Sequence, residues 1–274
     1  MFKSKIVKII LSILVIIAIL ALLYIDNKFI FQKIVQGKKF EKSAIEIYEM
    51  NKEPVFRVSK IIKYSSAEAI DNSSQQNLQD VSIHQYSDMA FYIDNLSDEL
   101  TEKNTIKELY LDNFKIDVGY NKGEHILYYK NPLTISKFRM IPENEIKDKL
   151  NYQIIYTNKD NEESNYETPV FFADCSNPIT LSFVNKNIVE NYKVTKENGL
   201  VSFDGRMLNN LDIDLDELSP KISFIIHIKN NLDEVYSCNV SANMKLETKD
   251  GSVKSGYIIE IEDDIGYYNF YREA

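Results

Sequence analysis

The chain has 274 residues, of which 44% are hydrophobic and 27% are charged, a composition typical of a globular protein and not of a disordered one. The formal net charge of −9 is unevenly divided: residues 1–40 carry seven Lys against one Asp, and the remaining residues carry 25 basic and 40 acidic side chains. An acidic domain repels phosphate backbones. We therefore expect no nucleic-acid partner.

The first element is the apolar run of residues 6–25, IVKIILSILVIIAILALLYI, which has no charge between Ile9 and Ile25. About 20 helical residues are enough to cross the ~30 Å hydrocarbon layer of a bilayer. Lys8 can extend its aliphatic stem and keep its ammonium at the interface. Residues 6–25 are therefore predicted to be a transmembrane helix whose partner is the lipid bilayer.

A cleaved signal peptide is the alternative, because Lys3, Lys5 and Lys8 form a basic N-terminal region. The apolar part is longer than in most signal peptides, and it ends in bulky residues, Leu22-Leu23-Tyr24-Ile25, where a signal peptidase requires small ones. We therefore favour an uncleaved signal anchor, with residues 1–5 as a short cytoplasmic tail.

Orientation does not follow from charge alone, because lysines flank both ends of the span. The short, wholly basic tail and the exported character of the distal domain favour a cytoplasmic N-terminus. The prediction is a single-pass protein of the cell membrane with its C-terminal domain outside.

Residues 26–53 are predicted to form an amphipathic helical stalk or linker, because apolar residues alternate there with lysines. Gly37 is the expected end of a first helix, and a second helix is expected over 38–51. Pro54 then closes the stalk.

From residue 55 the apolar period changes to two, and turn-forming residues such as Asn121-Lys122-Gly123 recur. We expect an extracytoplasmic, antiparallel β-sandwich over 54–274; two sandwich-like halves that divide near 145–150 are the alternative. A loop is expected over 65–80 and a short helix over 97–108. The predicted strands are 55–64, 81–95, 109–120, 124–130, 133–140, 150–157, 168–173, 179–185, 188–195, 199–208, 221–229, 234–247 and 253–262.

The strongest hairpin pattern lies at the C-terminus, where residues 236–246 and 253–261 flank Asp250-Gly251. Cys238 shares its alternating set with Val240 and Met244 and is expected to face the core. The apolar run 222–228 is typical of a central strand.

Cys175 and Cys238 are the two cysteines of the chain. In an exported domain, a disulfide between them would close a long loop and add stability. Two separate buried thiols are the alternative.

No catalytic, cofactor-binding or metal-binding motif is found. The sequence contains no G-x-S-x-G, H-E-x-x-H, G-x-G-x-x-G or P-loop. Its three histidines are His84, His125 and His227; His227 lies in an apolar run and is interpreted as a hydrogen-bonded sheet histidine. A Ser-His-Asp triad is recognised by geometry, so the sequence leaves it open. We expect no cofactor and no enzymatic activity.

Asp212, Asp214 and Asp216 have the spacing that opens an EF-hand loop, but Glu217 replaces the required Gly and Ser223 replaces the bidentate carboxylate. The acids are therefore interpreted as solvated, with a surface Ca²⁺ site built with other loops as the weaker alternative.

The resulting hypothesis is binding or scaffolding at the cell envelope, with an envelope protein or a glycan as the ligand. Residues 267–271 and the pair Tyr128-Tyr129 are candidate sugar-stacking aromatics, although aromatic residues on strands more often pack in the core. The alternatives are an anchored envelope hydrolase with a loop-built active site and a structural subunit of a membrane assembly. Fold alone does not choose among them.

Overall fold

A computed structural model describes residues 2–50, 52–71, 81–129, 144–156, 169–173, 178–193, 205–246, 248–249, 252–253, 258–261 and 268–273. The chain divides into an N-terminal unit that ends at Glu53 and a second compact unit, Pro54–Glu273.

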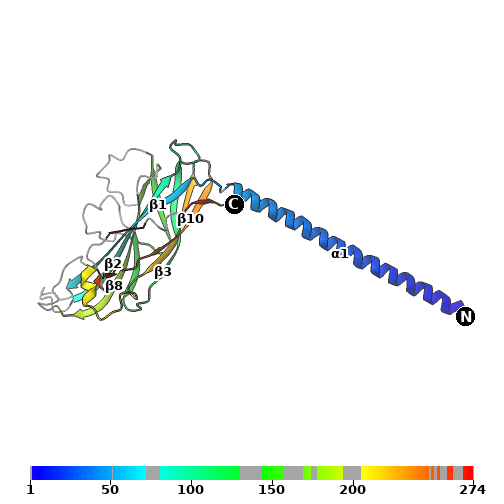
Figure 1. Ribbon diagram of the computed structural model, residues 1–274, viewed down its shortest axis with the longest axis horizontal. Helices are drawn as coiled ribbons and strands as arrows, with labels where there is room; N and C mark the ends of the chain where they lie inside the picture. The colour runs from blue at the N-terminus through cyan, green and yellow to red at the C-terminus, as the bar shows by residue number, and fades with distance from the viewer. Residues whose placement is uncertain are drawn as a thin grey trace. The chain divides into compact units, whose positions relative to one another are not determined.

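The N-terminal unit is one uninterrupted helix, α1 (Phe2–Met50) (Figure 1). Among the described residues it is the one helix long and apolar enough to cross a membrane. Every side chain from Leu14 to Ile25 is exposed. The prediction that Gly37 ends a helix is wrong: Gly37 does not adopt the positive φ of a helix cap. A glycine inside a helix costs only about 1 kcal/mol, which flanking helix-forming residues outweigh.

The second unit is mainly β and consists of two six-stranded sheets, with a two-stranded pair, β11 (Thr248–Lys249) and β12 (Ser252–Val253), and a 3-10 helix, η2 (Gly205–Asn210). In spatial order, sheet A comprises β13 (Ile258–Ile261), β1 (Phe56–Asp71), β2 (Val81–Asn95), β8 (Ile179–Tyr192), β4 (Glu124–Tyr129) and β5 (Asn144–Glu145). In spatial order, sheet B comprises β14 (Tyr271–Arg272), β10 (Val235–Asn243), β9 (Lys221–Asn230), β3 (Ile106–Asp117), β6 (Lys149–Ile155) and β7 (Val170–Phe172). The predicted mainly β, antiparallel character is confirmed, apart from the parallel pair β6/β7.

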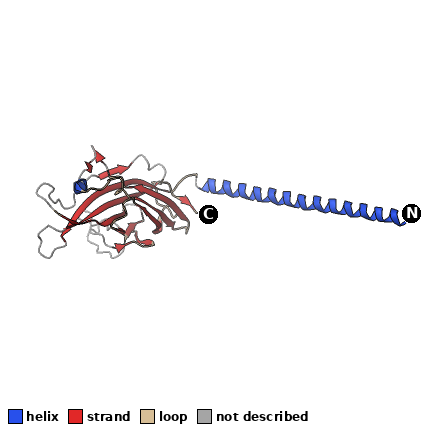
Figure 2. Ribbon diagram, turned by 90° about the horizontal axis from the view of Figure 1, so that it is seen from below, coloured by secondary structure: helices blue, strands red, loops and turns tan. Residues whose placement is uncertain are grey.

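The inward faces of the two sheets share a main core cluster of buried residues, and Figure 2 shows the strands in layers. Strand β9 alternates buried and half-buried residues, as a period of two requires. Phe91 of β2 meets Phe224 of β9 edge-to-face, with ring centroids 5.1 Å apart. The cluster draws residues from before and after positions 145–150.

A second, smaller cluster packs residues of β1, β2 and β8 against the segment from η2 to Leu218. Its buried members are Ala67, Ile83, Ile188, Met207, Leu208, Leu211, Leu218 and Leu246. A polar band of Gln85, Ser87 and Asn185, all fully buried, separates it from the main core cluster along β2 and β8.

The predicted C-terminal hairpin is confirmed next to its turn, where β11 and β12 pair antiparallel on either side of positions 250 and 251, but the longer strands have other partners. Strand β10 pairs with β9 and β14, whereas β13 pairs with β1 in the other sheet. Alternation identifies the two faces of a strand but not its neighbour. The same alternation does place Cys238, Val240 and Met244 in the core, as expected, and β9 lies between β10 and β3 as a central strand.

Three other predicted elements differ. Residues 65–71 of the expected loop at 65–80 belong to β1, which pairs with β2 as far as Asp71, and residues 72–80 lie outside the described residues. Residues 97–108 form no helix; Asn104 closes a turn there by donating to the carbonyl of Glu99 (2.6 Å), and β3 begins at Ile106. Of the strand predicted at 199–208, residues 205–208 lie in η2 and the others lie outside the described residues, as does 133–140.

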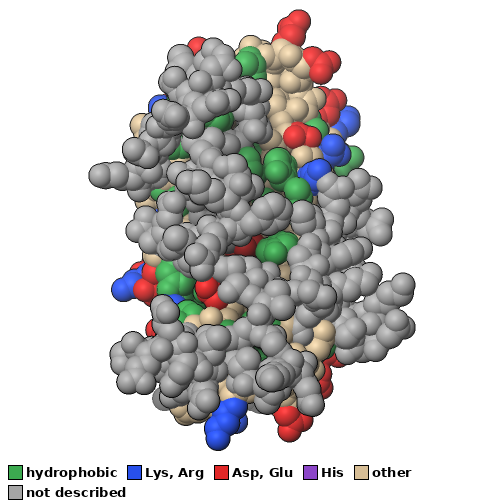
Figure 3. Space-filling model, turned by 90° about the vertical axis from the view of Figure 1, so that its left-hand side faces the viewer, with side chains coloured by type: hydrophobic (Ala, Val, Ile, Leu, Met, Phe, Trp, Pro, Cys, Tyr) green, Lys and Arg blue, Asp and Glu red, His purple; other side chains and the backbone are tan. Residues whose placement is uncertain are grey.

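On the face of the β domain shown in Figure 3, the described side chains include acidic, basic and apolar groups.

Candidate functional site

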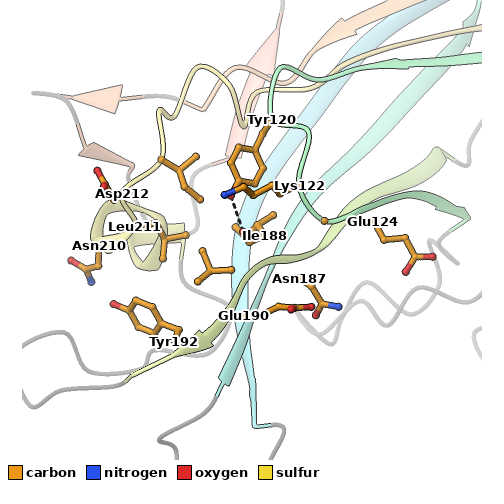
Figure 4. A pocket seen from close by; sticks show the side chains of 13 residues that line it. Tyr120, Lys122, Glu124, Asn187, Ile188, Glu190, Tyr192, Asn210, Leu211 and Asp212 are labelled. Atoms are coloured by element: carbon orange, nitrogen blue, oxygen red, sulfur yellow. Dashed lines mark hydrogen bonds between the residues drawn. The ribbon is translucent and has the colours of Figure 1, made fainter.

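The candidate site is a cavity of about 880 Å³ beside the second cluster (Figure 4). Three segments far apart in the sequence line it: residues 120–124, which enter β4; residues 187–192, which end β8; and residues 210–213, which follow η2. Its volume lies in the range of small-molecule sites.

Strand β8 reaches the cavity through two irregularities in its pairing with β2. The pairs Gln85↔Asn185 and Val81↔Tyr192 are four residues apart along β2 but seven residues apart along β8. Strand β8 therefore contains extra residues in this stretch. The extra residues include Asn187 (φ 54°) and Asn191 (φ 56°), and asparagine tolerates this left-handed backbone better than most residues. Bulges of this kind redirect side chains and are frequent beside binding sites. They explain why one strand was predicted as two, 179–185 and 188–195.

Gly123 allows the first segment, residues 120–124, to lie against β8. Its φ is 91°, and a Cβ at this position would overlap the Oδ1 atom of Asn185 and lie 2.5 Å from the carbonyl oxygen of Lys186. Both the backbone angle and the close approach therefore require glycine. The break predicted at Asn121-Lys122-Gly123 is present as a bend between β3 and β4.

The charged groups of the cavity come from all three segments. Glu124, Glu190 and Asp212 supply carboxylates, and Lys122 supplies one ammonium. In Figure 4 the three carboxylates lie on different sides of the cavity and do not converge on a single point. The site is therefore acidic, but it is not arranged around one small cation.

Two tyrosines and a row of apolar side chains complete the lining. The Tyr120 hydroxyl donates to the carbonyl oxygen of Ile188 at 2.9 Å, which fixes the ring beside the cavity. Burial, followed by the charge of Glu217, raises the pKa of Tyr120. Tyr192 and Leu211 lie on the β8 and η2 sides.

The structure keeps the three histidines apart. His84 shares a hydrogen bond with Asn187 (Nε2 to Oδ1, 2.9 Å), and burial lowers the pKa of His84. His125 packs near the ring of Phe183, and burial lowers the pKa of His125 as well. Among the described residues, none of the three is bonded to a serine, so the described geometry supplies no Ser-His pair.

His227 is a hydrogen-bonded sheet histidine, as the sequence predicted. Its Nε2 lies 3.0 Å from Asp112 Oδ1 and its Nδ1 lies 3.0 Å from Glu273 Oε1. Its ring stacks on Tyr110 with centroids 4.5 Å apart, and the Lys149 ammonium covers the same tyrosine.

The aspartates at 212–216 do not form a Ca²⁺ loop. Asp212 lines the cavity, whereas Asp214 Oδ1 accepts a hydrogen bond from the backbone of Asp216 at 2.9 Å in a local turn. Among the described residues, no group of three or more His, Cys, Asp or Glu side chains is placed to hold a metal.

The candidate sugar-stacking aromatics that the structure describes are divided between the core and the surface. Tyr129 is a core residue in edge-to-face contact with Tyr152. Tyr268 donates its hydroxyl to the carbonyl of Ser241, and Tyr271 is exposed. Tyr267 lies outside the described residues.

Cys238 is buried in the main core cluster, and burial raises the pKa of its thiol to about 12. Cys175 lies outside the described residues, so the pairing of Cys175 with Cys238 remains a prediction.

Sequence reasoning found parts of the cavity but not the cavity itself. The turn at 121–123, the break between the predicted strands at 186–187 and the acid at position 212 were each visible in the sequence. Nothing in the sequence indicated that these three segments meet in space.

Comparisons with protein-family models, with curated proteins and with solved structures gave no match. The assignment of function therefore rests on the helix, the β domain and the cavity described above.

Proposed function

We propose that this chain is a single-pass membrane-anchored β-sandwich protein with a binding role at the cell envelope. In this proposal its N-terminus is cytoplasmic, its helix spans the bilayer and its β domain presents the cavity outside.

The observation that carries the anchor is the complete exposure of the apolar side chains between Leu14 and Ile25. Burying one such side chain is worth about 1.5–3 kcal/mol, so a helix with this many exposed in water would be strongly disfavoured. Lipid removes that cost, and an α-helix satisfies its own backbone hydrogen bonds in the hydrocarbon layer.

Two features support the binding role. The two sheets enclose their own core cluster, which favours the sandwich architecture and provides a rigid support. The acidic, partly apolar cavity is built on bulged strand β8, and concave sites of this kind are typical of ligand recognition.

The experiment that tests the anchor uses two arginine variants of the full chain. Ile17→Arg places a charge near the centre of the predicted span at a cost of about 2.5–3.5 kcal/mol. Ile45→Arg is the matched control, because Ile45 is an equally exposed apolar residue of α1 outside the span. We expect Ile17→Arg to move protein from the membrane fraction to the soluble fraction and Ile45→Arg to leave it in place. Equal behaviour of the two variants would refute the anchor.

The orientation is tested by protease treatment of intact cells that carry a C-terminal tag. We expect the tag to be removed from intact cells. Protection of the tag in intact cells, with cleavage in a lysed control, would show that the domain faces inward.

A further inference from the structure

We infer that the cavity between residues 120–124, 187–192 and 210–213 binds an uncharged saccharide of about two or three rings, a size that its volume of about 880 Å³ accommodates. This inference rests on the proposed binding function and names the class of its ligand.

The charges of the cavity exclude one class of ligand at once. Three carboxylates against one ammonium repel phosphate, sulfate and carboxylate groups. A small cation is disfavoured for a geometric reason, since Glu124, Glu190 and Asp212 lie on different sides of the cavity and Lys122 lies among them. The lining therefore suits a ligand whose polar groups are spread around its rim and carry no net charge.

The hydrogen-bonding groups of the lining match hydroxyl groups. Carboxylates accept hydrogen bonds from hydroxyls, the Lys122 ammonium donates to hydroxyl oxygens, and the amides of Asn187 and Asn210 can do both. A hydroxyl is itself both donor and acceptor, so one polyhydroxylated molecule can satisfy this mixed set. Bonds to the ionised groups are the stronger ones.

The apolar part of the lining supplies surfaces against which the carbon–hydrogen faces of sugar rings can pack. Tyr120 is held in place by its hydrogen bond to the carbonyl of Ile188, and Tyr192 lies on the opposite side of the cavity (Figure 4). Rigid aromatic side chains give contact area at low entropic cost. The polar rim and the apolar wall of the cavity together complement a saccharide, which presents both hydroxyl groups and apolar ring faces.

The Asn185 amide shapes the wall of the cavity without lining it. It is buried, and its Oδ1 atom lies where a Cβ at position 123 would be. Position 123 must therefore be glycine, and this part of the cavity wall is bare backbone.

The test uses the full-length protein in lipid nanodiscs and titrates three neutral trisaccharides: chitotriose, cellotriose and maltotriose. Tri-lysine and tripolyphosphate serve as the cationic and anionic probes. Binding is measured by calorimetry and ligand-observed NMR at about 50 mM and about 500 mM salt, because screening weakens charged contacts and leaves neutral ones nearly unchanged.

We expect at least one trisaccharide to bind with a Kd that changes less than about twofold between the two salt concentrations. Glu190→Ala and Asp212→Ala should each weaken that binding by about tenfold, the usual effect of losing a charge-assisted hydrogen bond. Asp98→Ala and Glu99→Ala are the matched controls, since both carboxylates are exposed and lie outside the cavity. They should leave the Kd unchanged.

Three results would overturn the inference: no binding of any of the three trisaccharides at about 10 mM, a concentration at which even weak sites fill; trisaccharide binding that Glu190→Ala and Asp212→Ala leave intact; or tighter, salt-sensitive binding of tri-lysine or tripolyphosphate. If the protease and arginine experiments succeed while these titrations fail, the saccharide is wrong and the anchored domain stands.

Discussion

The C-terminal segment 268–273 is predicted to fasten the two sheets together, and Phe270 is the residue to test. The backbone of Val58 in β1 donates to Tyr268 (3.0 Å), and Phe270 donates to Phe56 (3.0 Å). The next two residues, Tyr271 and Arg272, form β14 and pair with β10 of sheet B. A few residues thus contact both sheets, and the Phe270 side chain enters the core between them.

The expected loss of unfolding free energy in Phe270→Ala follows from the burial of the Phe270 side chain. Phe270 is 1% exposed, and its ring meets Phe56 at 6.2 Å in an edge-to-face arrangement. Truncation of a fully buried phenylalanine to alanine costs about 3–5 kcal/mol of unfolding free energy. Tyr271 is the matched control, because it neighbours Phe270 in the same segment and is 50% exposed. Tyr271→Ala should change the unfolding free energy by less than about 0.5 kcal/mol.

The assay is urea unfolding of the full chain in detergent, followed by near-ultraviolet circular dichroism of the tyrosines, since the chain has no Trp. Limited proteolysis reports whether segment 268–273 detaches before the domain unfolds. A Phe270→Ala variant within about 1 kcal/mol of Tyr271→Ala, with no added protease sensitivity, would refute the role of this segment.

Four further outcomes are expected. Gly123→Ala should lower the unfolding free energy by about 2–4 kcal/mol, because position 123 has a positive φ and a Cβ there would contact the carbonyl of Lys186. Gly37→Ala should raise the helicity of α1 slightly, because nothing lies within 4 Å of a Cβ at that position. Circular dichroism during unfolding measures both effects. Ser87→Ala should stabilise the domain, because the buried Ser87 hydroxyl has no hydrogen-bond partner among the described residues. Ser182→Ala should destabilise it, because Ser182 donates to Asp88 at 2.6 Å. Urea midpoints should shift in opposite directions, and shifts in the same direction would contradict the prediction. Burial lowers the pKa of His84 below 6.5, so the unfolded chain binds the extra proton and stability falls as pH drops from about 7 to 5; His84→Gln should show a smaller fall in its urea midpoint. Cys238 should resist alkylation in the folded protein, because burial raises the pKa of its thiol to about 12. Alkylation of Cys238 after unfolding without reductant would show a free thiol. Alkylation only after addition of reductant would show the disulfide to Cys175.

The sequence predicted best those strands whose faces differ most. Strand β2 occupies 81–95 as predicted, because its inward positions, such as Ile83, Met89 and Phe91, alternate with half-buried ones. In β9 the almost continuous apolar run 222–228 predicted both the strand and its central position.

Failures occurred where partners rather than periodicity decide. Residues 65–71, Ser-Ser-Ala-Glu-Ala-Ile-Asp, have weak strand propensity, yet they continue β1 because β2 runs beside them throughout. The partner of β13 is likewise a property of the folded sheet, since an alternating strand fits several neighbours equally well. In 97–108, an apparent helix gave way to a turn in which the side chain of Asn104 replaces backbone hydrogen bonds.

Several departures from local rules lie around the cavity, whereas the positive φ of Asn113 in β3 does not, and this grouping is the reason to locate function there. Asn187 and Asn191 hold positive φ at the end of β8, Gly123 holds the loop against that strand, and Asn185 is buried with both amide atoms unpartnered among the described residues. By contrast, the positive φ of Asp233 belongs to an ordinary turn between β9 and β10. Local strain and unpaired polar groups reduce stability, and they persist mainly where binding or catalysis requires them. The regular half of the domain, around the main core cluster, can supply the stability that the irregular wall of the cavity gives up.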